Sequence, residues 1–496
     1  MSALLVVDNP KRWPLTIPGV QILAAGDYLT DRRYSDMRAA KVFNLCRSYR
    51  YQTAGYYVSL LAEARGHRPM PSISTLQDLR SRSVVRALSE DLDERIQRML
   101  KPLRSKTFEL SIYFGQNMAS RYDALAKAVF DLFPAPLLRA RLERAGKRWE
   151  LRSVVLMGAN DIPESHRAFV AEAAAAHFRR ARPVRRRRAV ARFDVAILVD
   201  AKEKTPPSDA KALRKFERAA DAVGLASEFI TRDDVGRLAE FDALFIRETT
   251  SVNHHTFRMA SRAEAEGLVV IDDPRSIIRC TNKVYLAELL DRYDVAIPKT
   301  LIVHRGNAHD VEAVCGFPCV LKAPDSSFSA GVIKVANAEE LHLALEKFFD
   351  GSDLVVAQEF LPTDFDWRVG VLDGRPLYVC RYHMAKSHWQ VIQRDASGKT
   401  SAEGAVDTLS VAEAPADIVR AAVRAANLIG DGFYGVDLKR IGRRAVVIEV
   451  NDNPNVDAGN EDAILKDALY REVMGLILRR IIARKRLEFE IGRAHV

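Results

Sequence analysis

The segment Gly435–Asn451 constrains the fold more tightly than any other part of this 496-residue chain. Two runs of strand-forming residues enclose a short polar centre, which predicts a β-hairpin folded about Arg443. In that register Asp437 lies directly opposite Glu449, and Asn451 shares their face because side chains alternate along a strand. The other face of the hairpin is expected to be apolar, with Val436, Leu438, Val446, Ile448 and Val450.

Two opposed carboxylates repel each other, so the predicted hairpin needs a positive charge between Asp437 and Glu449. Together with Asn451 they form a set of oxygen donors without histidine or cysteine, which suits a hard cation such as Mg²⁺. These three residues are the candidate metal ligands. The alternative is a solvent-exposed polar face on which Lys439 or an arginine neutralises the two carboxylates.

A second hairpin is predicted around Asp373-Gly374, a strong two-residue turn signal. In the register of that turn Asp366 faces Arg381, and Arg368 lies on the same side. Two guanidinium groups on one face would bind a carboxylate or phosphate. The alternative is an Asp366–Arg381 ion pair on an exposed sheet. The other face is expected to carry Val369, Val371, Tyr378 and Cys380.

A third hairpin is predicted over Cys319–Val335, where Lys322 interrupts an apolar strand. A buried ammonium group needs a partner, and the small residues that follow could close over a phosphate through their backbone N–H groups. The alternative is an ordinary turn, with the Lys322 side chain reaching solvent.

The order of apolar and polar segments divides the chain into parts. Up to residue 178, strand-like and helix-like stretches alternate, and from Phe193 a strand–helix–strand rhythm predicts a small parallel sheet. We therefore expect α/β and α+β architecture with five parts: an N-terminal α/β domain (1–178), an Arg/Pro-rich linker (179–192), a second α/β subdomain (193–280), a domain of hairpins and helices (281–486) and a tail (487–496).

The formal net charge of +10 is unevenly distributed. Residues 179–188 contain seven arginines and residues 479–486 contain five basic residues, so the remaining chain is close to neutral. No nucleic-acid partner is therefore expected for the folded bulk. The chain has five scattered cysteines, no apolar run of about 20 residues and no basic n-region at its start, so we expect reduced thiols, no membrane partner and a cytoplasmic location.

Together these segments resemble the ATP-grasp fold, most closely the RimK-like branch of carboxylate–amine ligases. The resemblance covers residues 193 to about 480. It rests on Thr281-Asn-Lys283, Val320-Leu-Lys322, Ala357–Leu361 with Asp366-Trp-Arg368, and Gly435-Val-Asp437 with Glu449–Pro454. The N-terminal segment resembles, more loosely, the extra domain ahead of some RimK-like ligases. In it Arg47, Tyr49 and Tyr51 follow a predicted strand and are either substrate-recognition or ordinary loop residues.

The resemblance implies a subdomain ahead of two hairpin-and-helix subdomains that clamp ATP, and it implies a role for each candidate residue. ATP would be bound by Lys283, Lys322, Ser327, Ser329, Gly331, Gln358, Glu359, Phe360 and Asp366. Asp437, Glu449 and Asn451 would hold Mg²⁺, two ions being expected and Mn²⁺ a substitute. Arg368, Arg381 and Lys386 would hold the acceptor carboxylate and the acyl phosphate formed from it.

The implied activity is ATP-dependent amide-bond formation between a carboxylate substrate and an amine substrate, with glutamate or another amino acid added to a peptide, protein or metabolite. Homo-oligomers are usual in related ligases. The alternatives are an ATP-grasp small-molecule kinase and a nucleotide-binding or RNA-associated module that uses the Arg-rich linker. Two features depart from the family: serines replace glycines in the phosphate loop, and Lys386-Ser-His-Trp389 replaces an Arg-Ser-Asn stretch. His254-His255 is interpreted as loop, and the end of the chain from Glu490 as a sequencing-adapter artefact.

Overall fold

The computed structural model describes residues 2–13, 17, 20–37, 40–80, 85, 92–146, 148–158, 161–180, 193–325, 331–385, 389–394 and 400–494. Several predictions concern residues outside these ranges. They include most of the expected Arg/Pro-rich linker (181–192) and the candidate site residues Ser327, Ser329 and Lys386, together with His388.

The N-terminal region begins with a parallel four-stranded sheet of order β2-β1-β3-β4. Its strands are β1 (Ser2–Val7), β2 (Gln21–Ala24), β3 (Ala40–Asn44) and β4 (Arg68–Met70), and its helices include α1 (Ala25–Thr30) and α3 (Ala54–Ala64). Alternation along β1 places Leu4 and Val6 against these helices and Leu5 and Val7 in the core on the other face. The predicted strand ahead of Arg47 is confirmed as β3.

An antiparallel three-stranded sheet, β5-β6-β7, completes this region. The strands are β5 (Thr107–Tyr113), β6 (Leu137–Ala145) and β7 (Arg148–Leu156), and the associated helices are α6 (Asp93–Leu100), α7 (Asp123–Leu132) and α8 (Arg167–Arg180). Its core is continuous with one face of the parallel sheet, because Phe43, Leu110, Phe130 and Ala173 belong to one buried cluster.

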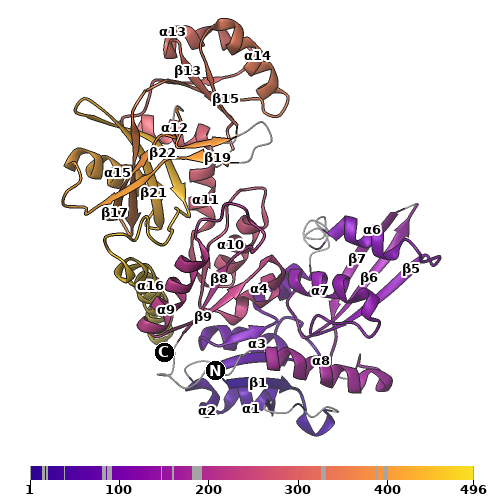
Figure 1. Cartoon of the computed structure of the whole chain (residues 1–496). Helices are drawn as coiled ribbons and strands as arrows, with labels where there is room; N and C mark the ends of the chain where they lie inside the picture. Colours follow the sequence, from indigo (N-terminus) through magenta and orange to yellow (C-terminus); the bar gives the residue numbers. More distant parts are fainter. Residues whose placement is uncertain are drawn as a thin grey trace.

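A second parallel sheet of order β11-β10-β8-β9 occupies the middle of the molecule, as predicted from the rhythm after Phe193 (Figure 1). Its strands are β8 (Phe193–Leu198), β9 (Leu225–Ile230), β10 (Ala243–Ile246) and β11 (Val269–Ile271), and its helices are α9 (Ala210–Val223), α10 (His255–Ala265) and α11 (Pro274–Thr281). The C-terminal helix α16 (Asp467–Ala494) packs on α9 and continues past the expected boundary at residue 486.

Among the described residues, the C-terminal region contains a two-stranded antiparallel pair, β18 (Ile392–Arg394) with β19 (Thr400–Glu403), and two larger antiparallel sheets. The smaller has the order β12-β15-β13-β14, formed by β12 (Thr300–Val303), β13 (Cys319–Lys322), β14 (Val332–Val335) and β15 (Val355–Glu359), with α13 (Val311–Cys315) and α14 (Ala338–Phe349). The larger has the order β20-β17-β16-β21-β22, with α12 (Lys283–Arg292) and α15 (Ala416–Ile429) in its core. The small sheet lies at the opposite end of the molecule from the N-terminal region (Figure 1).

The larger sheet joins the middle of the molecule through its second face. Leu372 and Phe433 on that face belong to the same buried cluster as Phe216 of α9 and Tyr470 of α16. The strands concerned are β16 (Phe365–Leu372), β17 (Arg375–His383), β20 (Val406–Leu409), β21 (Phe433–Ile441) and β22 (Arg444–Asp452). One end of this face is therefore fixed by apolar packing, and its other end carries the charged residues described below.

Ion pairs connect the N-terminal region to the middle sheet. Lys41 Nζ lies 2.9 Å from Glu240 Oε2, and Arg68 pairs with the buried Asp242. Because these groups are mostly buried, each charge depends on its partner. The five cysteines are free and buried, as expected.

Candidate active site

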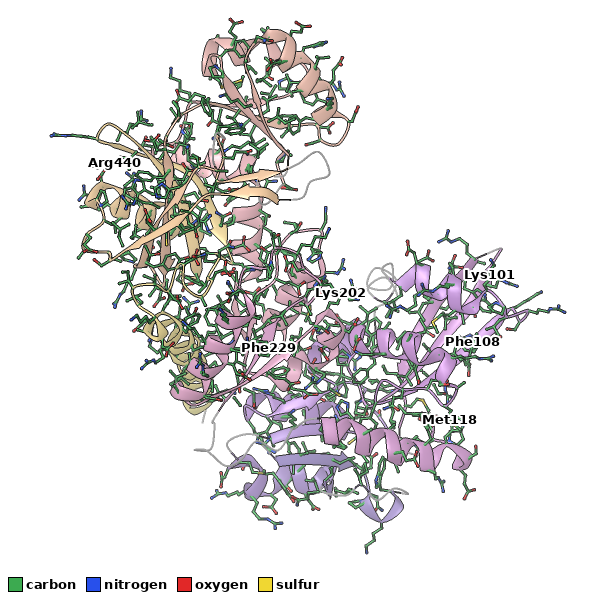
Figure 2. All side chains as sticks on the ribbon, viewed as in Figure 1. Lys101, Phe108, Met118, Lys202, Phe229 and Arg440 are labelled. Carbon is green, nitrogen blue, oxygen red and sulfur yellow. The ribbon has the colours of Figure 1, made fainter. Side chains whose placement is uncertain are left out.

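The β21–β22 hairpin brings Asp437 opposite Glu449 and Gly435 opposite Asn451, which confirms the predicted pairing. The path to this pairing differs from the prediction, because Ile441 pairs with Arg444 and the register near the turn is one residue off. A bulge between Asp437 and Leu438 restores the predicted register at the carboxylates. The tip of the hairpin is exposed, and Arg440 there extends away from the sheet (Figure 2).

The same bulge corrects part of the predicted apolar face. Val447, which was not predicted to be there, lies in the core with Val436, Leu438 and Val450. Ile448 is the extra residue, and it lines a small cavity of about 20 Å³ beside Lys283 and Lys322. Val446 pairs with Lys439 and so shares the face of the charged residues.

Two lysines from different elements converge on Glu449. Lys283 is the first residue of α12, and its Nζ lies 3.2 Å from Glu449 Oε1. Lys322 is the last residue of β13. Because side chains alternate along the strand, Leu321 points toward α13 and α14, and Lys322 points toward the larger sheet. Burial lowers the pKa of Lys322 to about 8. Burial opposes the charge on Glu449, yet Lys283 and Lys322 hold the pKa of that carboxyl below its ordinary value.

Asp437 is held by Arg368 and Asn451. Arg368 of β16 pairs directly across the ladder with Asp437, and its Nη2 donates to Asp437 Oδ2 over 2.8 Å. Asn451 Nδ2 donates to the same oxygen over 3.0 Å. Burial raises the pKa of Asp437, against the influence of Arg368, and the nearby Glu449 and Asp366 add to the increase.

The donor chemistry of this face fits a hard cation. Asp437, Glu449 and Asn451 lie side by side at the end of the hairpin nearest the small sheet's Lys322, and each presents an oxygen donor. The arginine of the predicted alternative is present, because Arg368 pairs with Asp437. The face is largely buried, however, and Lys439 donates to Asp366 Oδ1 over 2.6 Å. Arg368 and Lys283 provide the positive charge that the opposed carboxylates need.

The β16–β17 hairpin does not have the predicted register. A bulge between Gly370 and Val371 shifts the strands, so that Asp366 pairs with Tyr382 and Arg381 pairs with Trp367. Arg368 and Arg381 therefore lie on opposite faces, and the predicted two-arginine anion site is wrong in this structure. Arg381 contacts Asp407, with Nη2 3.3 Å from Oδ2, and its guanidinium stacks 5.5 Å from the Phe365 ring centre.

The bulge moves two further residues. Tyr378 and Cys380 were expected on the face that points away from the two arginines. They lie instead on the same face as Arg368 and pack toward the middle of the molecule. On that face the guanidinium of Arg368 lies 5.1 Å from the ring centre of Tyr382, whose hydroxyl donates to Glu461. Tyr382 thus occupies the position that the sequence had assigned to the second arginine.

Gln358, one of the residues expected to bind ATP, lines the small cavity beside Lys322. Gln358 of β15 is buried on the face shared with Lys322, and its Nε2 donates to Thr300 Oγ1 over 2.9 Å. Glu359 Oε1 accepts from the Lys299 backbone N–H over 2.9 Å, and Lys334 Nζ lies 3.9 Å from the Phe360 ring centre. These contacts fix the end of β15, which was predicted to bind ATP.

Gly331 closes the β13–β14 connection. Its carbonyl accepts from the Ala323 N–H over 2.9 Å, and its φ of +69° lies in the left-handed region that glycine adopts without strain. Side chains larger than glycine are strained at such a φ, so the requirement for Gly331 is a local backbone one.

Sequence reasoning missed Arg247 and Asn453. Arg247 is fully buried directly after β10, and its Nη1 donates to Asn453 Oδ1 over 2.7 Å. Asn453 follows the candidate ligand Asn451 by two residues and has a φ of +48°. The signal in the sequence was a charged residue at the carboxyl end of an apolar strand, where parallel sheets form ligand sites.

Comparisons with known proteins place this geometry in a family. Residues 25–173 match the model of the RimK-like ATPgrasp N-terminal domain, and residues 292–458 match the D-ala D-ala ligase C-terminus. A probable alpha-L-glutamate ligase of Teredinibacter turnerae is 26% identical over 255 residues, which cover 51% of this chain and 80% of that protein. The alpha-aminoadipate–LysW ligase LysX of Saccharolobus solfataricus is 28% identical over 220 residues, covering 42% of this chain and 75% of LysX.

Among solved structures, a RimK domain ATP-grasp protein from Sphaerobacter thermophilus overlaps 57% of this chain and 98% of its own, with a TM-score of 0.44 and 17% identity. The two family models and the curated relatives define the class as an ATP-dependent ligase that forms carbon–nitrogen bonds. Residues 25–173 match a RimK-like ATP-grasp N-terminal domain and residues 292–458 a ligase C-terminal domain, which confirms the predicted fold class.

Among the described residues, no helix is both long and apolar enough to cross a membrane.

Proposed function

We propose that the chain joins a carboxylate to an amine through an acyl phosphate, at the expense of ATP and with Mg²⁺ bound. One observation carries the proposal: Asp437, Glu449 and Asn451 converge from one hairpin on a position that Lys283, Lys322 and Arg368 approach from three other elements. Alternating fixed charges of this kind suit phosphoryl transfer, in which positioning and charge neutralisation provide most of the rate.

Asp437, Glu449 and Asn451 would hold Mg²⁺, which when bound screens the charge of the phosphates. Lys283 forms an ion pair with Glu449 and Lys322 acts on the same carboxylate electrostatically. Both lysines would bind the β- and γ-phosphates. Arg368, oriented by Asp437, would bind the acceptor carboxylate. A carboxylate oxygen attacks the γ-phosphorus and ADP leaves; the amine nitrogen then attacks the acyl carbon, phosphate leaves and the amine loses a proton.

Arg381 is not proposed as a second carboxylate-binding residue, because it faces away from Arg368. Gln358, Glu359, Phe360 and Asp366 are proposed as the adenine and ribose side of the site. Asp366 is held by Lys439, which keeps its second oxygen available for a ribose hydroxyl.

For the substrates we propose an amino acid, with glutamate first because the relatives include probable alpha-L-glutamate ligases, and a peptide, protein or metabolite as the other partner. We also propose a cytoplasmic homo-oligomer with the domain division 1–178, 193–280 and 281–486.

The test is a screen of ADP release over carboxylate–amine pairs, with mass spectrometry of the products. We expect ADP formation to need both substrates and Mg²⁺, and the product mass to equal the sum of the substrates less one water. A stable phosphorylated product formed without amine would establish a kinase instead. Nucleic-acid binding without ATP turnover would favour the RNA-associated alternative.

A further inference from the structure

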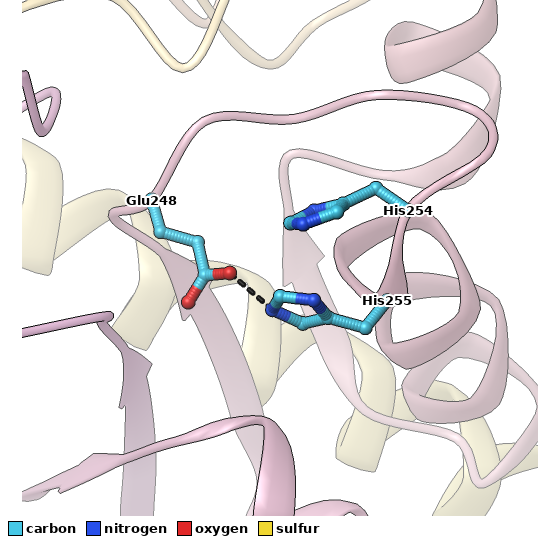
Figure 3. Close-up of side chains that lie close together, drawn as sticks. All are labelled: Glu248, His254 and His255. Carbon is cyan, nitrogen blue, oxygen red and sulfur yellow. Dashed lines mark ion pairs between the residues drawn. The ribbon is translucent and has the colours of Figure 1, made fainter. Parts of the chain in front are cut away.

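A carboxylate and two imidazoles form a cluster at the carboxyl end of β10, apart from the three candidate Mg²⁺ ligands (Figure 3). Glu248 lies two residues after the strand, His254 is the N-cap of α10 and His255 is its first residue. One ligand atom from each of the three side chains lies within 4.8 Å of the others. The sequence suggested only a loop here, because Glu248 is separated from the two histidines and joins them through the fold.

The carboxylate of Glu248 is buried, so its negative charge needs a partner. Only 2% of the residue is exposed, and its Oε1 pairs with Nε2 of His255. Its Oε2 is also buried and accepts no hydrogen bond from any residue that the structure describes. A buried carboxylate oxygen without a partner is costly, and a bound cation removes that cost.

The two imidazoles are arranged as metal ligands commonly are. Nδ1 of His254 lies 3.1 Å from the Thr256 hydroxyl, a contact that orients the ring and leaves Nε2 as its second nitrogen. The ring centres of His254 and His255 are 3.9 Å apart.

The surrounding charge is mixed and includes a second carboxylate. Glu203 accepts from the Thr249 N–H over 3.1 Å, directly beside Glu248, and burial together with Glu248 raises the pKa of Glu203. Arg258 and Arg232 also act electrostatically on His254. The cluster therefore has both carboxylates and guanidinium groups in its surroundings.

We propose that Glu248, His254 and His255 bind one divalent transition-metal ion of the Zn²⁺ class. Two imidazole nitrogens and one carboxylate oxygen are a donor set that Zn²⁺ accepts, whereas Mg²⁺ prefers oxygen alone. Ligand atoms around tetrahedral Zn²⁺ stand about 2.0–2.2 Å from the ion. Glu248 and His255, which are in direct contact, must therefore move apart to hold an ion between them. Three protein ligands leave a fourth coordination position open.

The site contacts the segment that follows the candidate Mg²⁺ ligands. The backbone carbonyl of Glu248 accepts from Asn453 Nδ2 over 2.6 Å, and Asn453 lies two residues beyond Asn451. A metal at Glu248 would therefore stiffen the loop that supports Asn453. The proposal itself does not depend on the ligase function, because binding is measured without turnover.

The test is Zn²⁺ and Co²⁺ binding to the full chain after treatment with a chelator, in excess Mg²⁺. We expect one tight Zn²⁺ equivalent per chain by calorimetry, and with Co²⁺ the visible absorption of a tetrahedral nitrogen- and oxygen-ligated ion. His254→Ala, His255→Gln and Glu248→Gln should each weaken binding by at least about tenfold. Their folding is checked by circular dichroism.

Two controls separate this site from others. His342→Ala removes an exposed histidine of α14 that pairs with Glu346, and it should leave Zn²⁺ affinity unchanged. Asp437→Asn, which alters the proposed Mg²⁺ site, should leave the Zn²⁺ equivalent in place. The proposal is overturned if the wild type takes up no stoichiometric Zn²⁺, or if the three cluster variants bind it as tightly as the wild type.

Discussion

The same reasoning predicted two hairpins of the larger sheet, β21–β22 and β16–β17. The structure has the predicted pairing of candidate site residues in the first hairpin and a different pairing in the second. In each, a turn signal set the register and alternation assigned the faces. In each, the structure contains one bulge that shifts the strands by a residue. In β21–β22 the bulge corrects a turn that was placed one residue off, so Asp437 and Glu449 meet. In β16–β17 the turn was placed correctly, and the bulge moves Arg381 to the other face.

The difference shows what a bulge does to a candidate site. A shift of one residue turns a whole strand over, because side chains alternate with a period of two. The faces beyond a bulge are then decided by burial: Trp367 and Val369 enter the core with Val379, and Arg381, which pairs with Trp367, lies on that face and away from Arg368. The turn alone predicts the faces up to the bulge where the turn is placed correctly, and the faces beyond it depend on the bulge as well.

The largest expected effect concerns the carboxylate pair of β21–β22. Asp437→Asn and Glu449→Gln should each lower kcat for ADP release by about 10²–10³-fold, since each removes a charge aimed at the metal and phosphates. The matched control is Asp417→Asn on α15, whose carboxylate pairs with Arg440 at 2.9 Å away from the site. ADP release at the wild-type rate in either site variant would refute the metal assignment.

The two arginines of β16–β17 provide the direct test of the comparison. Arg368→Ala breaks a buried pair with Asp437 and should cost about 3–5 kcal/mol of unfolding free energy as well as activity. Arg381→Ala breaks a partly exposed pair with Asp407 and should cost no more than about 1 kcal/mol, with activity retained. Urea unfolding and ADP release measure both. Equal loss of activity in the two variants would restore the two-arginine site.

The third effect is a dependence of stability on pH through Lys322. Burial lowers the pKa of Lys322 to about 8 in the folded chain, below its ordinary value of 10.5. Between about pH 8 and 10.5 the unfolded chain therefore binds one proton more than the folded chain, and this group makes stability rise with pH, by at most about 1.4 kcal/mol per unit. Below pH 8 both states carry the charge and the contribution is flat.

The measurement is the difference in unfolding free energy between wild type and Lys322→Met across pH 7 to 10, which cancels the contributions of other groups. Lys347→Met, on the outer helix α14, is the control and should show no such slope. A difference that stays constant with pH would mean that Lys322 is not held in a buried, charge-poor setting.

Much of the fold followed from local patterns, and the site followed only in part. Alternation and turn residues predicted the strands that carry Lys322, Asp437 and Glu449, because period-two burial decides those faces. Arg247 and Asn453 escaped prediction because they meet across more than two hundred residues, through the docking of the middle sheet against the larger one. No local pattern records such a contact.

The smallest expected effect concerns the bulge residue itself. Ile448 lines the cavity beside Lys283 and Lys322 because the bulge turns it away from the core that Val447 fills. Ile448→Ala should raise the KM for ATP by about tenfold, through lost apolar contact, and leave kcat nearly unchanged. Ile441→Ala, at the exposed tip of the same hairpin, should change neither. If Ile448→Ala instead lowered stability and left KM unaltered, Ile448 would belong to the core, and the bulge would not be what brings the two carboxylates together.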